Sequence, residues 1–137
     1  MNEDQATTQS VILEREFAHP PQKVWRALTE PHLMAEWLMK NDFRPVRGHR
    51  FGFHAEWGSV TCEVLEIEPA TSLSYTWGDH ELKTVVTWTL TPRGAGTLLR
   101  MEQTGFRHDQ PTRYFHGAKA GWPRFLDALE ALLARLG

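Results

Sequence analysis

Three side chains have the types and spacing that acid–base chemistry requires. His54 and Glu56 lie two residues apart in a segment of alternating apolar and polar residues, and Glu102 lies in a second such segment. A buried histidine–glutamate pair can act as general acid and general base, whereas the same residues on an outer face form a cross-strand ion pair. Because Phe51 and Phe53 occupy the opposite face of the first segment, the alternation favours an outward pair. The identity of any catalytic residues is therefore left open.

Metal and nucleophile chemistry have less support in the sequence. His80, His108 and His116 are expected in loops or at a helix start, and no two of them have the i, i+4 spacing of a helical metal site. Cys62, the single cysteine, has no nearby helix start or histidine that would activate its thiol. The sequence predicts no metal and no cofactor.

The aromatic side chains favour a different chemistry, the binding of an apolar molecule. The chain has 6 Trp, 7 Phe and 2 Tyr among 137 residues, and ligand cavities are lined mainly by apolar and aromatic side chains. Packing in the core is the alternative for each ring, and a slip of one residue in strand register would exchange inward and outward residues. The residues predicted to line the walls or entrance of a cavity are Phe51, Phe53, Trp57, Tyr75, Trp77, Trp88, Met101, Trp122 and Phe125.

The element that must position these rings is a long helix near the end of the chain. From about residue 110 to 136, apolar residues recur at steps of three and four, the spacing of one stripe on an α-helix. Such a helix, roughly 39 Å long, needs a large apolar surface, and only a β-sheet can provide it in this chain. Gly117, Gly121 and Pro123 weaken its first half, so a kink or a loosened turn is expected near Gly121.

The remaining segments predict that sheet. A strand over residues 11–17 precedes two short helices, around residues 21–28 and 33–38, each of which follows a proline. Six strand-like segments joined by short turns then cover residues 43–46, 51–57, 60–67, 73–77, 82–91 and 97–104. Short connections favour antiparallel pairing. The sequence therefore predicts an α+β fold in which the long C-terminal helix packs on the concave face of a curved antiparallel sheet.

Length, charge and cysteine content limit the class of protein. A chain of 137 residues fits one domain; residues 1–9 have no apolar pattern and are expected to be a disordered tail, and residues 10–137 a single domain. The net charge of −2 gives no electrostatic reason to expect nucleic acid, and no apolar run reaches the ~20 residues of a membrane span. One cysteine and an N-terminus without a signal-peptide pattern favour a cytoplasmic protein.

Short motifs in a fixed order add a resemblance to a known family. They are Arg15-x-Phe17, Pro20, Val24-Trp25-x-Ala27-Leu28-Thr29, Trp37, Gly48-x-x-Phe51, Gly58-x-Val60, Glu63-Val64-x-Glu66-Ile67-x-Pro69, Leu73-x-Tyr75-x-Trp77, Gly96-Thr97-x-Leu99, Thr104-Gly105-Phe106 and Gly121-Trp122-x-x-x-Leu126. With these motifs the chain resembles the START-like (SRPBCC) superfamily. Within it, the chain is similar to homologues of the C-terminal domain of the heat shock protein 90 ATPase activator, over residues 10–136.

The resemblance implies the helix-grip fold, in which the C-terminal helix clasps a curved antiparallel sheet over a cavity. Members of the superfamily commonly bind lipids, hormones, polyketides or other apolar molecules there. We therefore expect the chain to bind a small hydrophobic or aromatic ligand. Two alternatives stay open: a cyclase- or hydrolase-type enzyme that uses polar residues in the cavity, and a protein-interaction module resembling a chaperone cofactor. Formation of a homodimer also stays open.

Overall fold

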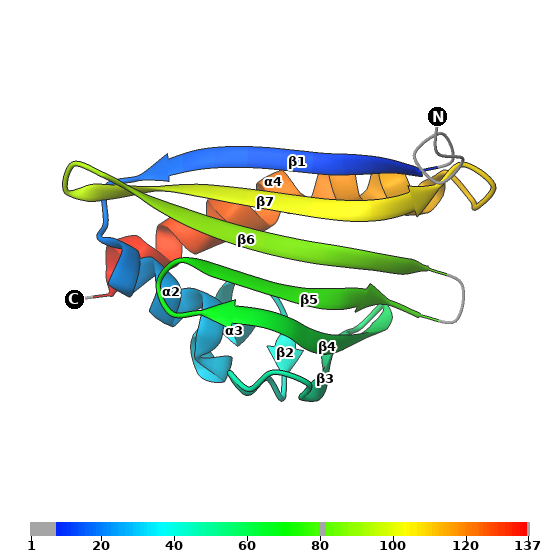
Figure 1. The fold of residues 1–137 in the computed structure, drawn as a ribbon, viewed down its shortest axis with the longest axis horizontal. Helices are drawn as coiled ribbons and strands as arrows, with labels where there is room; N and C mark the ends of the chain where they lie inside the picture. Colours follow the sequence, from blue (N-terminus) through cyan, green and yellow to red (C-terminus); the bar gives the residue numbers. More distant parts are fainter. Residues whose placement is uncertain (1–7, 80–81, 137) are drawn as a thin grey trace.

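A curved antiparallel sheet and one long helix make up most of the fold (Figure 1). The computed structural model describes residues 8–79 and 82–136. The elements in chain order are β1 (Thr8–Phe17), α2 (Pro21–Thr29), α3 (Pro31–Trp37), β2 (Lys40–Asn41), β3 (Arg50–Ala55), β4 (Gly58–Glu68), β5 (Ser72–Gly78), β6 (Lys83–Arg93), β7 (Gly96–Arg107) and α4 (Arg113–Arg135). The predicted α+β helix-grip architecture is confirmed. Thr8 and Gln9, expected in the tail, belong to β1, and the rest of that tail lies outside the described residues.

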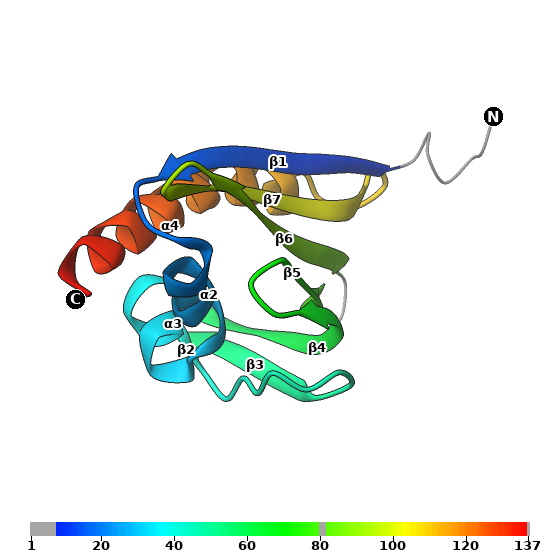
Figure 2. The same cartoon turned by 60° about the vertical axis from the view of Figure 1, so that its left-hand side comes forward.

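The seven strands form one sheet in the order β1-β7-β6-β5-β4-β3-β2. Every neighbouring pair is antiparallel, and β1 lies beside β7, so the first and last strands of the chain are joined. The sheet bends strongly, which brings its two ends around the helices on the concave side (Figure 2). Alternation along β6 and β7 buries the inward set of side chains and leaves the outward set partly exposed, as the period of two requires.

Apolar packing holds the helices on the concave side. α2 and α3 both begin at a proline, and the indole N–H of Trp37 in α3 donates a hydrogen bond of 2.7 Å to the carbonyl oxygen of Ala27 in α2. The close backbone contacts of α4 are with β1, α2 and α3. Helix α4 runs without a break through Gly121 and Pro123. The kink or loosened turn expected near Gly121 stays a prediction. Its buried stripe is Trp122, Leu126, Leu129, Leu132 and Leu133.

One predicted strand is displaced. The segment 43–46 is not a strand; β2 is instead the pair Lys40–Asn41, which lies beside β3. The side-chain oxygen of Asn41 accepts a hydrogen bond from the backbone N–H of Phe43, which turns the chain directly after β2. The Phe43 ring then packs edge-on against Phe51, with ring centroids 5.1 Å apart. Phe43 is thus buried without a strand partner, whereas Val46 in the same segment is 57% exposed.

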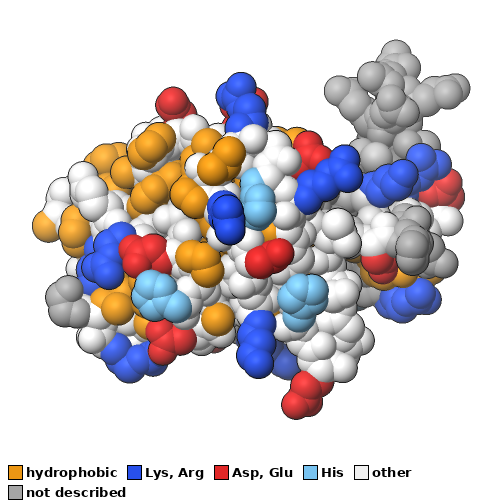
Figure 3. Space-filling model, turned by 90° about the horizontal axis from the view of Figure 1, so that it is seen from below, with side chains coloured by type: hydrophobic (Ala, Val, Ile, Leu, Met, Phe, Trp, Pro, Cys, Tyr) orange, Lys and Arg blue, Asp and Glu red, His pale blue; other side chains and the backbone are white. Residues whose placement is uncertain are grey.

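Charged side chains of both signs are interspersed on the face shown in Figure 3. Two ion pairs, Arg47 with Glu66 at 2.8 Å and Arg50 with Glu63 at 3.2 Å, neutralise much of the arginine cluster around residues 44–50. Among the residues that the structure describes, no helix is long and apolar enough to cross a membrane.

Candidate functional site

A cavity of about 390 Å³ lies between the first half of α4 and the sheet. It is at the end of the molecule where β5 leads toward β6 and α4 begins, on the right of Figure 1. The helices α2 and α3 fill the concave side at the other end (Figure 2). Because they do not extend to this end, the side chains of the sheet and of α4 enclose a space between them.

Two glycines open the helix side of the cavity. Gly117 and Gly121 are four residues apart on α4 and, with Phe125, form one line along the helix that borders the cavity. A Cβ atom added at Gly117 would meet nothing within 4 Å, and one at Gly121 would meet only the edge of Phe125 at 3.9 Å. The missing side chains therefore leave room that larger residues would fill.

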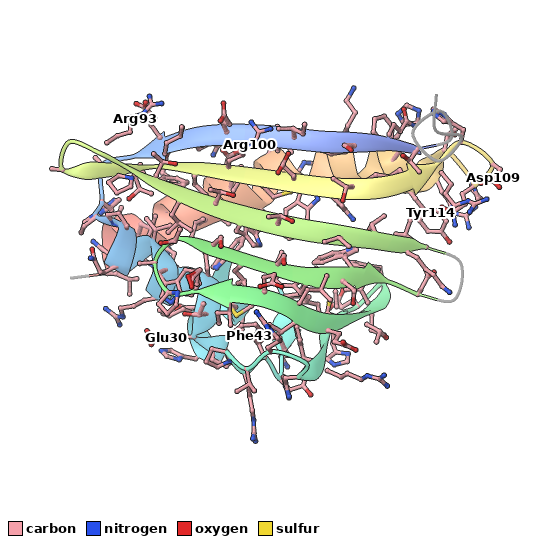
Figure 4. All side chains as sticks on the ribbon, in the orientation of Figure 1. Glu30, Phe43, Arg93, Arg100, Asp109 and Tyr114 are labelled. Carbon is pink, nitrogen blue, oxygen red and sulfur yellow. The ribbon has the colours of Figure 1, made fainter. Side chains whose placement is uncertain are left out.

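Aromatic rings form much of the wall. The rings of Trp77 and Trp122 are 5.2 Å apart between centroids, and Phe125 follows Trp122 at 5.5 Å. Trp57 lies at the rim and is 68% exposed. Tyr114, at the start of α4, also borders the cavity and is labelled in Figure 4. Further apolar wall comes from Met39, Val60, Leu82 and Ala118.

The rim carries charges of both signs, because Asp79 and Arg113 both border the cavity. The guanidinium of Arg113 lies 4.8 Å from the centre of the Tyr114 ring, within the range of a cation–π contact. The site is thus apolar and aromatic within and polar at its edge. This distribution suits a molecule with an apolar body.

One polar side chain, Gln103, reaches the buried wall of the cavity. It is 2% exposed, and its side-chain oxygen accepts a hydrogen bond of 2.7 Å from the indole N–H of Trp122. Its amide nitrogen donates to the hydroxyl oxygen of Thr84 at 2.9 Å, and that hydroxyl donates to the carbonyl oxygen of Trp77 at 2.7 Å. This chain of three hydrogen bonds links α4 to β7, β6 and β5.

The nine predicted wall residues divide into two groups. Four of them border this cavity: Trp57, Trp77, Trp122 and Phe125. The other five do not border it and are buried in the packed core: Phe51, Phe53, Tyr75, Trp88 and Met101. Trp77 of the first group and the five core residues come from strands and share the concave face of the sheet, but the core residues lie where neighbouring rings and helices fill the space. Contact of any of the nine with a ligand stays a prediction.

Ring contacts show why the second group is enclosed. Phe51 packs against Tyr75 at 5.4 Å, and Trp88 lies between Trp37 of α3 and Trp122 of α4 at 5.7 and 5.6 Å. The indole N–H of Trp88 donates to the hydroxyl of Tyr75 at 2.9 Å. Burial raises the pKa of that hydroxyl above its ordinary value of 10.0, which keeps it protonated.

The acid–base candidates lie outside the cavity. His54 and Glu56 are exposed, as the alternation favoured. Glu102 is on the outward side of β7, where it accepts a hydrogen bond of 3.1 Å from Arg100, the residue labelled over the sheet in Figure 4. Arg100 also pairs with Glu14 of β1 at 3.3 Å. Glu102 therefore belongs to a surface ion-pair network, and His54 and Glu56 are exposed, so the three candidates do not form a buried acid–base pair.

The remaining reactive side chains do not border the cavity either, where they can be placed. Cys62 is buried, and burial raises the pKa of its thiol, which opposes formation of a thiolate. His108 and His116 are exposed, and His80 lies outside the described residues. Among the residues with described positions, no group of three or more His, Cys, Asp or Glu side chains could hold a metal ion.

Comparison with known proteins identifies relatives of this architecture. A family model described as Activator of Hsp90 ATPase homolog 1-like protein matches residues 18–134. The solved structure of MLL2253 from Mesorhizobium loti is 56% identical in sequence, with a TM-score of 0.88, and the match covers 94% of this chain and 99% of MLL2253. No curated protein matches the chain.

Two more distant structures share the fold. CalU16 from Micromonospora echinospora is 22% identical, with a TM-score of 0.80, and the match covers 93% of this chain and 78% of CalU16. DynU16, a protein in the dynemicin biosynthetic locus, is 25% identical, with a TM-score of 0.79. That match covers 92% of this chain and 47% of DynU16. The helix over a curved sheet is therefore shared across relatives of low sequence identity.

Proposed function

The chain belongs to the Activator of Hsp90 ATPase homolog 1-like family, and we propose that it binds a small hydrophobic or aromatic molecule between α4 and the sheet. The observation that carries the proposal is the cavity of about 390 Å³ with aromatic walls and a glycine-lined helix. Its volume is near the lower end of the ~300–1,000 Å³ range of ligand pockets, which suits a molecule of a few fused rings. The presence of DynU16 in a biosynthetic locus agrees with a small-molecule role.

The two alternatives have weaker support. A cyclase or hydrolase would need reactive groups in the cavity, and His54, Glu56 and Glu102 lie elsewhere. A protein-interaction module would use exposed apolar side chains, and the most exposed large one, Trp57, is accounted for by its place at the cavity rim. Ligand binding uses the enclosed space itself, so it is the function that the geometry supports best.

Native mass spectrometry of protein purified without detergent tests whether the cavity is occupied. We expect an additional mass that is lost on denaturation, because an apolar cavity of this size favours retention of an apolar guest. The same spectrum reports the number of chains in the particle. A bare chain that also fails to bind an added aromatic probe would contradict the proposal.

A matched pair of variants tests the location of binding. Gly121→Leu places a side chain in the cavity, whereas Ala120→Leu places the same side chain on the exposed side of the same helix. We expect Gly121→Leu to weaken binding of the probe 2-ethylnaphthalene by about tenfold or more, a loss of ~1.4 kcal/mol or more, and Ala120→Leu to leave it unchanged. Quenching of tryptophan fluorescence reports affinity, and circular dichroism reports folding. Equal affinities of the two variants would place binding elsewhere.

Three broader features belong to the same proposal. We propose that residues 10–137 fold as one domain, supported by the single sheet that joins β1 to β7. A cytoplasmic location is supported by the single, buried cysteine, and cell fractionation tests it. A homodimer stays a prediction, which the native mass of the particle tests.

A further inference from the structure

We infer that the molecule bound in the cavity carries a carbonyl oxygen that accepts a hydrogen bond from the side-chain amide of Gln103. The inference rests on the proposed function and specifies the ligand class as uncharged aromatic ketones, quinones and related carbonyl compounds. It is carried by the one buried amide in the wall of the cavity and by the direction of its hydrogen bonds.

The orientation of the Gln103 amide follows from its partners. An indole N–H can only donate, so the Gln103 atom that lies 2.7 Å from Trp122 Nε1 must be the oxygen. The amide nitrogen therefore faces Thr84, whose oxygen accepts while its hydroxyl hydrogen is donated to Trp77. The chain of donors runs in one direction, from Trp122 to Trp77, and does not allow the amide to be turned over.

This orientation leaves one donor available. An amide nitrogen carries two N–H bonds that diverge by about 120° in the amide plane. The N–H that donates to Thr84 therefore leaves the other N–H pointing in a different direction, where it needs a second acceptor. Within the part of the chain that the structure describes, Thr84 is the partner of the nitrogen and Trp122 of the oxygen, and the second N–H has none. Since a buried N–H without an acceptor is unfavourable, a ligand acceptor would satisfy it.

The surroundings narrow the class of acceptor. The indole of Trp122, which donates to the Gln103 oxygen, lies 5.2 Å from the Trp77 ring between centroids, and both rings border the cavity. The body of the ligand is therefore expected to be apolar. A carboxylate would be unfavourable at this depth, because one neutral amide does not offset the cost of burying a charge. A carbonyl oxygen needs only a donor, and the hydrogen bonds along the chain polarise the amide that supplies it.

Two probes of matched shape test the inference. 2-Acetylnaphthalene has a carbonyl oxygen where 2-ethylnaphthalene has two hydrogens, but the hydrocarbon is more apolar, so their affinities for one protein cannot be compared directly. Each probe is therefore titrated against the wild type, Gln103→Met and Thr84→Val. Gln103→Met removes the amide at similar volume, whereas Thr84→Val breaks the same hydrogen-bond chain and keeps the amide.

Loss of the amide is expected to weaken 2-acetylnaphthalene about threefold to tenfold more than 2-ethylnaphthalene, the ratio for one neutral hydrogen bond. Thr84→Val is expected to change both affinities by the same factor. In the wild type, the side-chain amide signal of Gln103 in ¹⁵N NMR spectra should move when 2-acetylnaphthalene binds and stay in place with 2-ethylnaphthalene. If Gln103→Met does not fold, this spectrum of the wild type still tests whether the Gln103 amide binds the carbonyl oxygen.

The outcomes separate the two proposals. Binding of both probes with no dependence on Gln103, and with an unmoved amide signal, would overturn the carbonyl inference and leave the binding function standing. Failure of both probes to bind the wild type would overturn the proposed function and this inference with it.

Discussion

At the scale of single residues, the glycines of α4 lower the stability of the helix and enlarge the cavity beside it. Glycine in a helix interior is less favourable than alanine because it loses more backbone freedom on folding. Gly117 borders the cavity within α4, where an added Cβ would meet nothing within 4 Å. Steric fit therefore does not require glycine at this position, and the missing side chain adds to the volume of the cavity.

We expect Gly117→Ala to raise the free energy of unfolding by about 0.5–1 kcal/mol. The substitution adds helix propensity without a steric conflict. The reverse change at an exposed position of the same helix, Ala120→Gly, should lower it by a similar amount. Urea denaturation followed by circular dichroism measures both. A less stable Gly117→Ala protein would show that the helix start depends on glycine for another reason.

The sequence contains a signal for some residues that border the cavity and none for others. Gln103 alternates with Leu99 and Met101 in β7, which places a polar side chain on the buried face, and that signal could have marked it. Helix propensity marks Gly117 and Gly121 only as weak points of the helix and gives no sign that they border a cavity. Asp79 directly follows the last residue of β5 and Arg113 is the first residue of α4, positions where no apolar period predicts the direction of a side chain.

At the scale of elements, apolar burial rather than charge holds α4 in place. Leu129 is fully buried on the stripe that faces the core. The ion pair between Arg15 of β1 and Asp127 of α4 is short, at 2.7 Å, but its side chains are 27% and 72% exposed. Water screens such a pair, so its contribution to stability is small.

Substitutions at these two positions should therefore differ in effect. We expect Leu129→Ala to lower the free energy of unfolding by about 2–5 kcal/mol, the range for a buried leucine. Asp127→Asn should lower it by less than about 1 kcal/mol. Chemical denaturation of both variants at one ionic strength makes the comparison. A larger loss in Asp127→Asn would mean that the ion pair fixes the helix on β1.

The elements themselves were largely predictable, because their apolar periods are regular. Apolar residues that recur with a period of two locate most strands, and those with a period near 3.6 locate the three helices α2, α3 and α4. The family resemblance adds how these elements are arranged in the fold. The exact positions of the turns are harder to predict from the sequence. The strand predicted over residues 51–57 ends at Ala55, and Gly58, with φ of +145°, already opens β4. Trp57 therefore lies in the turn and at the cavity rim rather than on the inner face of β3.

At the scale of the whole molecule, one network of aromatic rings connects the core to the cavity. It runs through the edge and tilted contacts from Phe51 to Phe53, Trp77, Trp122 and Phe125. The sequence predicts the presence of these rings on one face, but where the core ends and the cavity begins depends on how far α2 and α3 reach along the sheet. That distance follows from tertiary packing and has no local signal.

The buried core also predicts how stability depends on alkaline pH. Burial raises the pKa of the Cys62 thiol above 9.0 and that of the Tyr75 hydroxyl above 10.0. Above these ordinary values the unfolded chain loses the two protons while the folded chain retains them. The unfolded state is therefore favoured as pH rises. Well below pH 9 both groups are protonated in the folded and in the unfolded chain, so they do not make stability depend on pH. At higher pH the free energy of unfolding should fall by about 1.4 kcal/mol per pH unit for each group that titrates only in the unfolded state.

Tyr75→Phe separates the two groups. The variant loses the acceptor of the Trp88 indole N–H, so it should be less stable than the wild type at every pH. Its stability should nevertheless fall less steeply above pH 10, because only Cys62 then contributes to the slope. Urea denaturation from pH 8 to 11 at constant ionic strength measures both curves. Equal slopes above pH 10 would mean that the Tyr75 hydroxyl ionises as readily in the folded protein as in the unfolded chain, and that this part of the core admits water.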